Sequence, residues 1–164
     1  MPLSRHRESI ISHAPGRLRA EIIAVSIADS WDEARGEWAL ADVYLTDSPG
    51  RCLCGHPITE HCLIVNHLNG NEVVVGNVCV QQFIGLPSER LFAALRRISA
   101  DIGAALNDET IEHAYREGWI NNWEASFYLD TMRKRKLWPR QRAKRVEINE
   151  KVLARCRGGA VCNA

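Results

Sequence analysis

The sequence predicts an α+β protein in which a cysteine-bearing β-hairpin is followed by a C-terminal bundle of three to four helices. A Cys-x-Cys-Gly turn at residues 52–55 precedes the predicted hairpin, and a Gly-x-x-Cys segment at residues 76–79 follows it. Beyond residue 87, apolar residues recur at spacings of three and four, which is the period of an amphipathic helix. The chain has 164 residues, 46% of them hydrophobic and 25% charged, so it is long enough and apolar enough to form a core.

The N-terminal part, residues 1–86, is expected to hold the β-structure. Its composition predicts strands over residues 17–27, 38–45, 58–66 and 72–75. We expect a polar turn over residues 29–36 and a short helix over residues 4–14. Asn69 and Gly70 lie between the last two strands, and because both residues tolerate positive φ, they predict a hairpin there.

The second part, residues 87–157, is expected to be helical. The first helix presents one apolar face formed by Leu91, Leu95, Ile98, Ile102 and Leu106. Asn107 and Asp108 end that helix and cap a second one, which Gly118 stops, while Asn121 or Asn122 caps a third. Pro139 suits the first turn of a fourth helix that runs to about Arg155, and residues 158–164 are expected to form a loose tail.

The cysteines point to metal binding rather than to disulfides. The first residues contain no apolar segment of signal-peptide length, and no stretch approaches the roughly 20 apolar residues that span a membrane, so we expect a cytoplasmic protein with reduced thiols. Zinc favours four tetrahedral thiolate or imidazole ligands. Cys52 and Cys54 on one turn, with Cys79 at the start of a helix whose dipole favours a thiolate, are therefore predicted to bind Zn²⁺. The resulting zinc-stapled hairpin would be treble-clef-like.

The fourth ligand is expected to come from the segment between these cysteines, where the candidates are His56, His61, Cys62 and His67. His56 lies too near Cys54 in the sequence to close the site easily. His61 and Cys62 are neighbours on a strand, so their side chains face opposite ways and only one of them can point at the metal. Cys62 is preferred and His61 is the alternative. Buried free cysteines remain the competing interpretation, and Cys156 and Cys162 are interpreted as incidental.

Residues 52–83 carry a spaced pattern of cysteine, glycine and apolar positions. The residues concerned are Cys52, Cys54, Gly55, Ile64, Asn66, Gly70, Val75, Gly76, Cys79 and Phe83. This pattern resembles one in small uncharacterised bacterial and phage proteins, with a CxCG turn, an Ile-x-Asn segment, a hairpin, Val-Gly-x-x-Cys and a nearby Phe. Later residues resemble the helical extension of some of those proteins, so that the likeness covers about residues 37–153. The resemblance implies a zinc site and a phage or mobile-element origin, but no activity.

The C-terminal end of the chain is strongly basic. Residues 133–164 contain eleven Lys or Arg and two acidic residues, a net charge of +9, whereas residues 1–132 carry a net charge of −8. Such a segment is typical of proteins that bind phosphates. The residues predicted to contact nucleic acid are Arg133, Lys134, Arg135, Lys136, Arg140, Arg142, Lys144 and Arg145. Trp138, within this run, is interpreted as a core anchor rather than a base-stacking platform, and Trp119, Trp123, Phe127 and Tyr128 are also expected in the core.

The function predicted from these features is a non-catalytic, zinc-stabilised accessory protein that binds DNA or RNA. Two alternatives explain the basic end: pairing with acidic groups of the chain itself, or binding to an acidic protein surface, as in an adaptor or inhibitor of a host nucleic-acid-handling or defence complex. The sequence lacks a Gly-rich phosphate loop, Gly-x-Ser-x-Gly and His-Glu-x-x-His. It also lacks the Pro-Cys-x-x-Cys half of the zinc-deaminase pattern, so no enzymatic activity is expected.

Overall fold

A computed structural model describes residues 15–83 and 88–158, and within these ranges the fold is α+β. The described chain contains a three-stranded antiparallel sheet, seven α-helices and one 3₁₀ helix. The elements are α1 (Pro15–Ala24), α2 (Trp31–Ala34), η1 (Arg35–Glu37), β1 (Trp38–Arg51), β2 (Pro57–Asn66), β3 (Glu72–Gly76), α3 (Asn77–Val80), α4 (Ser88–Ala100), α5 (Asp108–Arg116), α6 (Asn122–Thr131) and α7 (Pro139–Gly158). The helix predicted over residues 4–14 and the tail after residue 158 lie outside the described residues.

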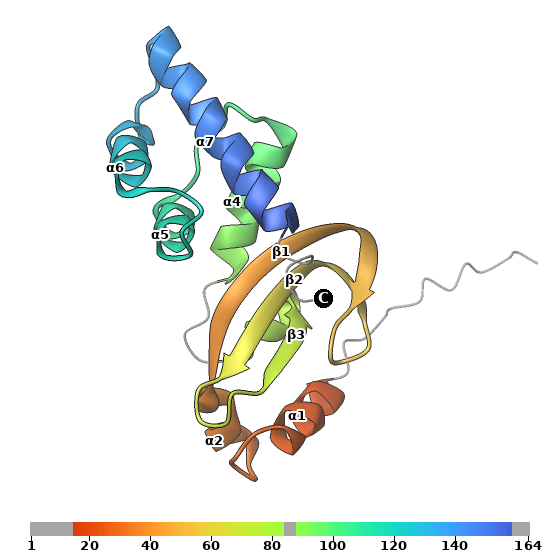
Figure 1. Ribbon diagram of the computed structural model, residues 1–164. Helices are drawn as coiled ribbons and strands as arrows, with labels where there is room; N and C mark the ends of the chain where they lie inside the picture. Colours follow the sequence, from red (N-terminus) through yellow and green to blue (C-terminus); the bar gives the residue numbers. More distant parts are fainter. Residues whose placement is uncertain (1–14, 84–87, 159–164) are drawn as a thin grey trace, which may run out of the picture.

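The sheet has the order β1-β2-β3, and β2 pairs antiparallel with both neighbours. Cys62 lies opposite Val43 of β1 and Val75 of β3, and all three side chains are buried. The strands predicted over 38–45, 58–66 and 72–75 are present, although β1 continues to Arg51. Figure 1 shows this long strand curving over the sheet, with α4 to α7 at one end of the sheet and α1 and α2 at the other.

The prediction of a strand over residues 17–27 is wrong, because most of this segment forms helix α1. Leu18 and Ile22, one helical turn apart, are fully buried against the core, while the residues between them are mostly exposed. The polar segment that follows holds the short helices α2 and η1 rather than a simple turn. The buried carboxylate of Glu37 accepts hydrogen bonds from the backbone N–H groups of Ile27 and Ala28 and from the Asn66 side chain, so it ties this region to the end of β2.

The helix starts predicted at Asn107 and Asn121 are confirmed. The Asn107 side chain accepts a hydrogen bond from the Thr110 N–H at 2.9 Å. Asn121 caps α6 through a full capping box, in which the Glu124 carboxylate accepts the Asn121 N–H in return. The first long helix is shorter than predicted: α4 ends at Ala100, and Ile102 and Leu106 lie in the loop before α5.

A buried polar network joins the helices to one another. The Tyr128 hydroxyl of α6 donates to Asn149 Oδ1 of α7 at 2.7 Å and accepts the Leu106 N–H at 3.0 Å. The Asn149 amide donates to the carbonyls of Ile102 and Ala104 at 2.7 and 2.8 Å. Since Tyr128 and Asn149 are fully buried, this network fixes α6, α7 and the loop between α4 and α5 relative to each other.

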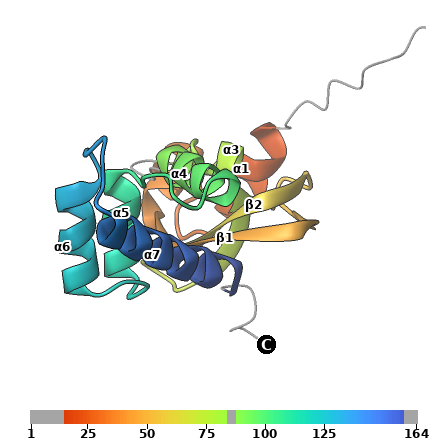
Figure 2. The ribbon, with the colours of Figure 1, turned by 90° about the horizontal axis from the view of Figure 1, so that it is seen from above.

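Helix α7 connects the helices to the sheet. Seen from above, α5 and α6 form the outer side of the helical group, while α4 and α7 lie nearer the sheet (Figure 2). Cys156, near the end of α7, is fully buried and its thiol lies 3.6 Å from the carbonyl oxygen of Val43 in β1. Cys156 lies outside the cysteine cluster, as its interpretation as incidental to a metal site implies, but it packs in the interface with the sheet. Cys162 lies outside the described residues. None of the described helices has the length and apolar character needed to cross a membrane.

Candidate metal centre

Three of the predicted ligands meet in one buried cluster. The sulfur atoms of Cys52, Cys54 and Cys79 all lie within 4.8 Å of one another, and the Cys54 and Cys79 sulfurs are 3.6 Å apart. With Zn–S distances of about 2.3 Å, tetrahedral ligands are separated by about 3.8 Å, so this spacing suits a metal of that size. The three residues are free thiols rather than a disulfide, and together they could hold a metal ion.

Two glycines allow the backbone to bring these cysteines together. The turn from Cys52 is closed by hydrogen bonds from the Gly55 N–H to the Cys52 carbonyl at 2.7 Å and from the Cys52 N–H to the His56 carbonyl at 2.8 Å. Gly55 has a φ of 92°, a conformation that other residues rarely adopt. At Gly76 the constraint is space, because a Cβ there would lie 2.8 Å from Ile58 Cγ2, and the Gly76 N–H donates to the Cys52 sulfur at 3.2 Å.

The surroundings favour a thiolate at one of the three sulfurs. A hydrogen bond from the Cys79 thiol and backbone N–H groups of Cys54 and Gly76 lower the pKa of Cys52 to about 5, against the effect of burial. The pKa of Cys79 is correspondingly raised, first by its hydrogen bond to Cys52 and then by burial. A thiolate at Cys52 would carry a negative charge that a metal cation compensates. Helix α3 has only four residues, so the predicted contribution of a helix dipole at Cys79 is small.

The structure does not bring Cys62, the preferred fourth ligand, into the cluster. Cys62 is fully buried on β2, its side chain interacts with Ser88 at the start of α4, and burial raises the pKa of its thiol to about 12. The alternative, His61, is also outside the cluster: its Nε2 lies 2.9 Å from the Thr46 hydroxyl, and its ring stacks on Tyr44 with centroids 4.6 Å apart. The two side chains do face opposite ways, as predicted, but neither reaches the three sulfurs.

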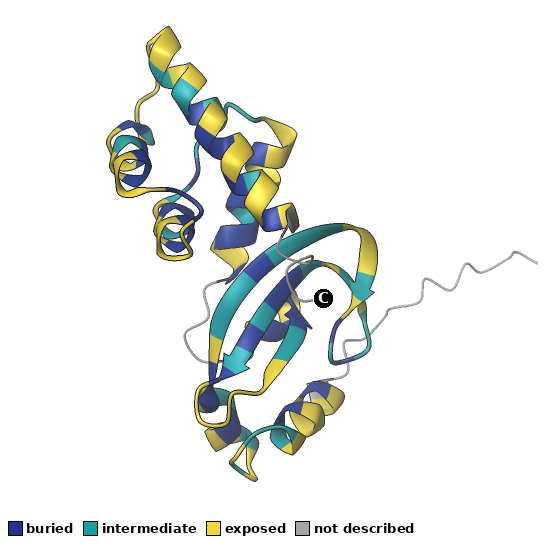
Figure 3. Cartoon of the chain, in the orientation of Figure 1, coloured by how far each residue is buried: buried dark blue, intermediate teal, exposed yellow. Residues whose placement is uncertain are grey.

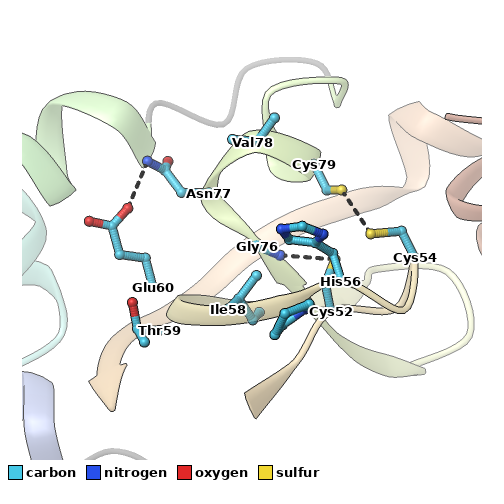
Figure 4. A pocket seen from close by; sticks show the side chains of 11 residues that line it. Cys52, Cys54, His56, Ile58, Thr59, Glu60, Gly76, Asn77, Val78 and Cys79 are labelled. Atoms are coloured by element: carbon cyan, nitrogen blue, oxygen red, sulfur yellow. Dashed lines mark hydrogen bonds between the residues drawn. The ribbon is translucent and has the colours of Figure 1, made fainter. Parts of the chain in front are cut away.

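The histidine that shares the cavity with the cysteines is His56. Cys52, Cys54, His56 and Cys79 line the same cavity of about 260 Å³, which extends along β2 to Glu60 and Asn77. Figure 4 shows the His56 ring beside this group, with Cys54 and Cys79 on one side and Gly76 on the other. Glu60 is already engaged at the far end of the cavity, by the Arg96 guanidinium and by the Asn77 amide at 3.1 Å. The sequence predicts the turn at residues 52–55, but His56 was set aside because only one residue separates it from Cys54.

The eight basic residues of the C-terminal segment do not form one uniform set. Arg145 is buried, with 6% of its surface exposed, where it donates to the Thr131 carbonyl at 2.6 Å and lies over the Tyr128 ring. Lys144 pairs with Glu147 at 2.7 Å and lies over the Trp123 ring. The other six are exposed and form no ion pair within the described part of the chain: Arg133, Lys134, Arg135, Lys136, Arg140 and Arg142. We call these six residues the basic surface.

An exposed tryptophan lies within the basic surface. Trp138 has 76% of its surface exposed, so its interpretation as a core anchor is wrong. Its backbone is nevertheless fixed at the start of α7, because its N–H donates to the Gln141 side chain at 3.1 Å and its carbonyl accepts the Arg142 N–H at 2.9 Å. Figure 3 shows the first turns of α7 mostly exposed, in contrast to the buried stripe farther along the helix.

Of the other aromatic residues expected in the core, Trp119 and Tyr128 are buried and Phe127 is half-buried, but Trp123 is 59% exposed. Trp123 differs from Trp138 because Phe127 stacks on its ring, with centroids 5.5 Å apart, and the Lys144 ammonium lies 5.4 Å from its centroid. Its ring is therefore already in contact with its neighbours.

Comparison with protein-family models gives no match for this chain. Comparisons with the curated proteins and with the solved structures give no match either. The resemblance to small bacterial and phage proteins stays a prediction.

Proposed function

We propose that this chain is a non-catalytic, zinc-stabilised protein that binds nucleic acid through its basic surface. Zinc is the metal that best suits three thiolates held at tetrahedral spacing. A Cys-x-Cys-Gly turn, the β2–β3 hairpin and a cysteine in the following helical turn are also the parts of a treble-clef-like zinc staple. The metal would join the start of β2 to the end of β3 and contribute directly to folding.

The observation that carries the nucleic-acid assignment is the exposed Trp138 amid unpaired cations. Four of the cations precede it in the connection from α6, and Arg140 and Arg142 follow it on the first turn of α7. Arginine and lysine attract phosphates without regard to sequence, and an exposed indole offers a face on which a base can stack. The alternative of pairing within the chain is not supported at these six residues, since they form no ion pair with the described acidic groups.

The assignment is tested by binding of the zinc-loaded protein to fluorescently labelled single- and double-stranded DNA and RNA. Replacing Lys134 and Arg135 with Gln removes two phosphate contacts and should weaken binding by about 30-fold at 0.15 M salt. The matched control replaces Arg116 and Arg155, which are exposed cations outside the basic surface, with Gln and should leave the affinity nearly unchanged. Arg155 lies on the same helix as Arg142 but about 20 Å farther along it.

Stacking is tested separately with Trp138→Ala, which should weaken single-strand binding by about 5- to 150-fold. Since the ring is exposed, this change should leave the thermal unfolding temperature within about a degree or two of the parent value. Absence of binding to every nucleic acid at low salt, or an equal effect of the basic-surface and control variants, would contradict the proposal.

A second candidate function is binding to an acidic protein surface, and one observation favours it. A shallow cavity of about 650 Å³ beside Trp138 is lined by Arg142 and by the apolar side chains of Leu137, Pro139, Ala143 and Val146. An acidic peptide with an apolar side chain would fit such a combination better than a nucleic acid would. Capture of partners from a host lysate with and without nuclease treatment separates the two functions. Partners that persist after nuclease treatment and require Leu137 and Val146 would favour the protein-binding role.

A further inference from the structure

The three sulfurs of the cysteine cluster leave one tetrahedral position to be filled. We infer that His56 supplies the fourth ligand, so that the centre is a Cys₃His site formed by Cys52, Cys54, His56 and Cys79. This inference rests on the zinc site of the proposed function and deepens it. It changes the ligand set predicted from the sequence, which contained Cys62 or His61 instead.

His56 lines the same cavity as the three cysteines, whereas Cys62, His61 and His67 do not line it. His61 and Cys62 have other contacts on the two faces of β2, with Tyr44 and Thr46 on one side and Ser88 on the other. His67 is exposed in the connection between β2 and β3. His56 is therefore the one imidazole among the described residues that borders the cavity of the three sulfurs.

The positive φ of Gly55 reverses the chain directly after Cys54, and the Cys52 N–H then bonds to the His56 carbonyl. Residue 56 is thereby held beside residue 52 instead of continuing away from the cluster. In Figure 4 the His56 ring lies on the side of the turn where the sulfurs gather. A bulkier residue at position 55 would be strained in this conformation, and its Cβ would also lie 2.6 Å from the Arg17 guanidinium.

The His56 nitrogens are not among the atoms that lie within 4.8 Å of one another, so metal binding requires rotation of the ring about its χ angles. Such a rotation is an exchange between staggered rotamers, which needs no change in the backbone. His56 is half-buried and lines a cavity of about 260 Å³ together with the three cysteines. Imidazole and thiolate together are an ordinary ligand set for structural zinc.

The test uses the full chain and measures Zn²⁺ affinity by competition with a chromophoric chelator. Replacement of an outer hydrogen-bonding partner costs 10- to 100-fold in metal affinity, so loss of a direct ligand in His56→Ala should cost more than about 100-fold. His56→Cys should retain four-coordinate binding, because a thiolate replaces the imidazole. The matched controls, His67→Ala and Cys62→Ala, should bind zinc like the parent protein.

A second measurement does not depend on the folding of any variant. The parent protein is loaded with ¹¹³Cd²⁺, and scalar coupling from the metal to the His56 ring protons is sought by NMR. Coupling to His56 supports the inference; coupling to the ring of His61 or His67 instead, or to the protons of Cys62, overturns it, as does undiminished zinc affinity in His56→Ala. A parent protein that binds neither zinc nor cadmium would overturn the zinc site of the proposed function as well, so the two failures are distinguishable.

Discussion

The salt dependence of nucleic-acid binding can separate the cations that face solvent from those that serve the fold. Eight basic residues lie between residues 133 and 145, but Arg145 is buried and Lys144 is paired with Glu147. Six neutralised phosphates predict that the logarithm of the affinity for duplex DNA falls with the logarithm of salt with a slope of about −5. For a single strand the slope is about −4. Participation of all eight would give about −7 for the duplex.

The perturbation that distinguishes these cases is Arg145→Gln, compared with Arg140→Gln. Arg145→Gln leaves the Thr131 carbonyl without its hydrogen bond and should lower the free energy of unfolding by about 2 kcal/mol, with the salt slope unchanged. Arg140→Gln removes an exposed cation and should reduce the slope by about 1 with little effect on stability.

The assay is fluorescence anisotropy of a labelled duplex between 50 and 200 mM salt, over which the parent affinity should fall by about 1,000-fold. Chemical denaturation of the same samples gives the stabilities. A slope change in Arg145→Gln at unchanged stability would refute the division of these residues into a basic surface and a structural pair. A parent slope near −2 would refute the assignment of six phosphate contacts.

Three further predictions concern the buried groups. Asn149→Ala should lower the free energy of unfolding by about 3 kcal/mol and Tyr128→Phe by about 1 to 2 kcal/mol, because each leaves buried hydrogen-bonding partners unsatisfied. Denaturant titration of the two variants measures which loss is larger. Burial, and then the charge of Arg116, lower the pKa of His113 to about 4, below its unfolded value near 6.5. The contribution of neutral His113 to the free energy of unfolding is therefore complete above about pH 6.5. As the pH falls toward 4 it is lost, by up to about 3 kcal/mol. Thermal melts at a series of pH values should show that His113→Phe removes this acid dependence. Cys62→Ala should destabilise the fold by about 1 to 2 kcal/mol but leave one metal bound per chain by elemental analysis, whereas Cys79→Ser should lose it.

The parts of the fold that local chemistry determines could be predicted from the sequence. Asn107 and Asn121 mark helix starts because their side chains accept backbone N–H groups three residues on, an interaction that requires no knowledge of the tertiary structure. The β2–β3 hairpin follows from Asn69-Gly70 in the same way, and Gly70 does have positive φ. The three cysteines were found because thiolates at the ends of a hairpin converge whatever surrounds them.

Tertiary structure decided the features that were predicted wrongly. Residues 17–27 are rich in β-branched side chains, which favour a strand locally. Burial of Leu18 and Ile22 on one face of a helix outweighs this local propensity. The position of His56 depends on a chain reversal at Gly55. His61 and Cys62 were correctly predicted to lie on opposite faces of β2, but the sequence alone does not show which face is turned toward the cysteine cluster. The exposure of Trp138 was missed because an aromatic residue beside a helix start usually packs inward, and only the folded chain shows that α7 begins beyond the core.

The cysteine cluster and the basic surface lie in separate parts of the molecule, and this arrangement constrains how they can cooperate. Figure 1 shows α7 beginning far from the sheet and ending against β1, whereas the cysteine turn lies between β1 and β2, at the sheet. A metal there cannot contact a phosphate held at Arg140 or Arg142, so its proposed role is to stabilise the sheet. The contact of Cys156 with Val43 fixes the far end of α7 to that sheet, and Val43 lies opposite Cys62 in the strand pairing. Zinc would then act on nucleic-acid binding through the stability of the fold that orients α7, and not through the binding surface itself.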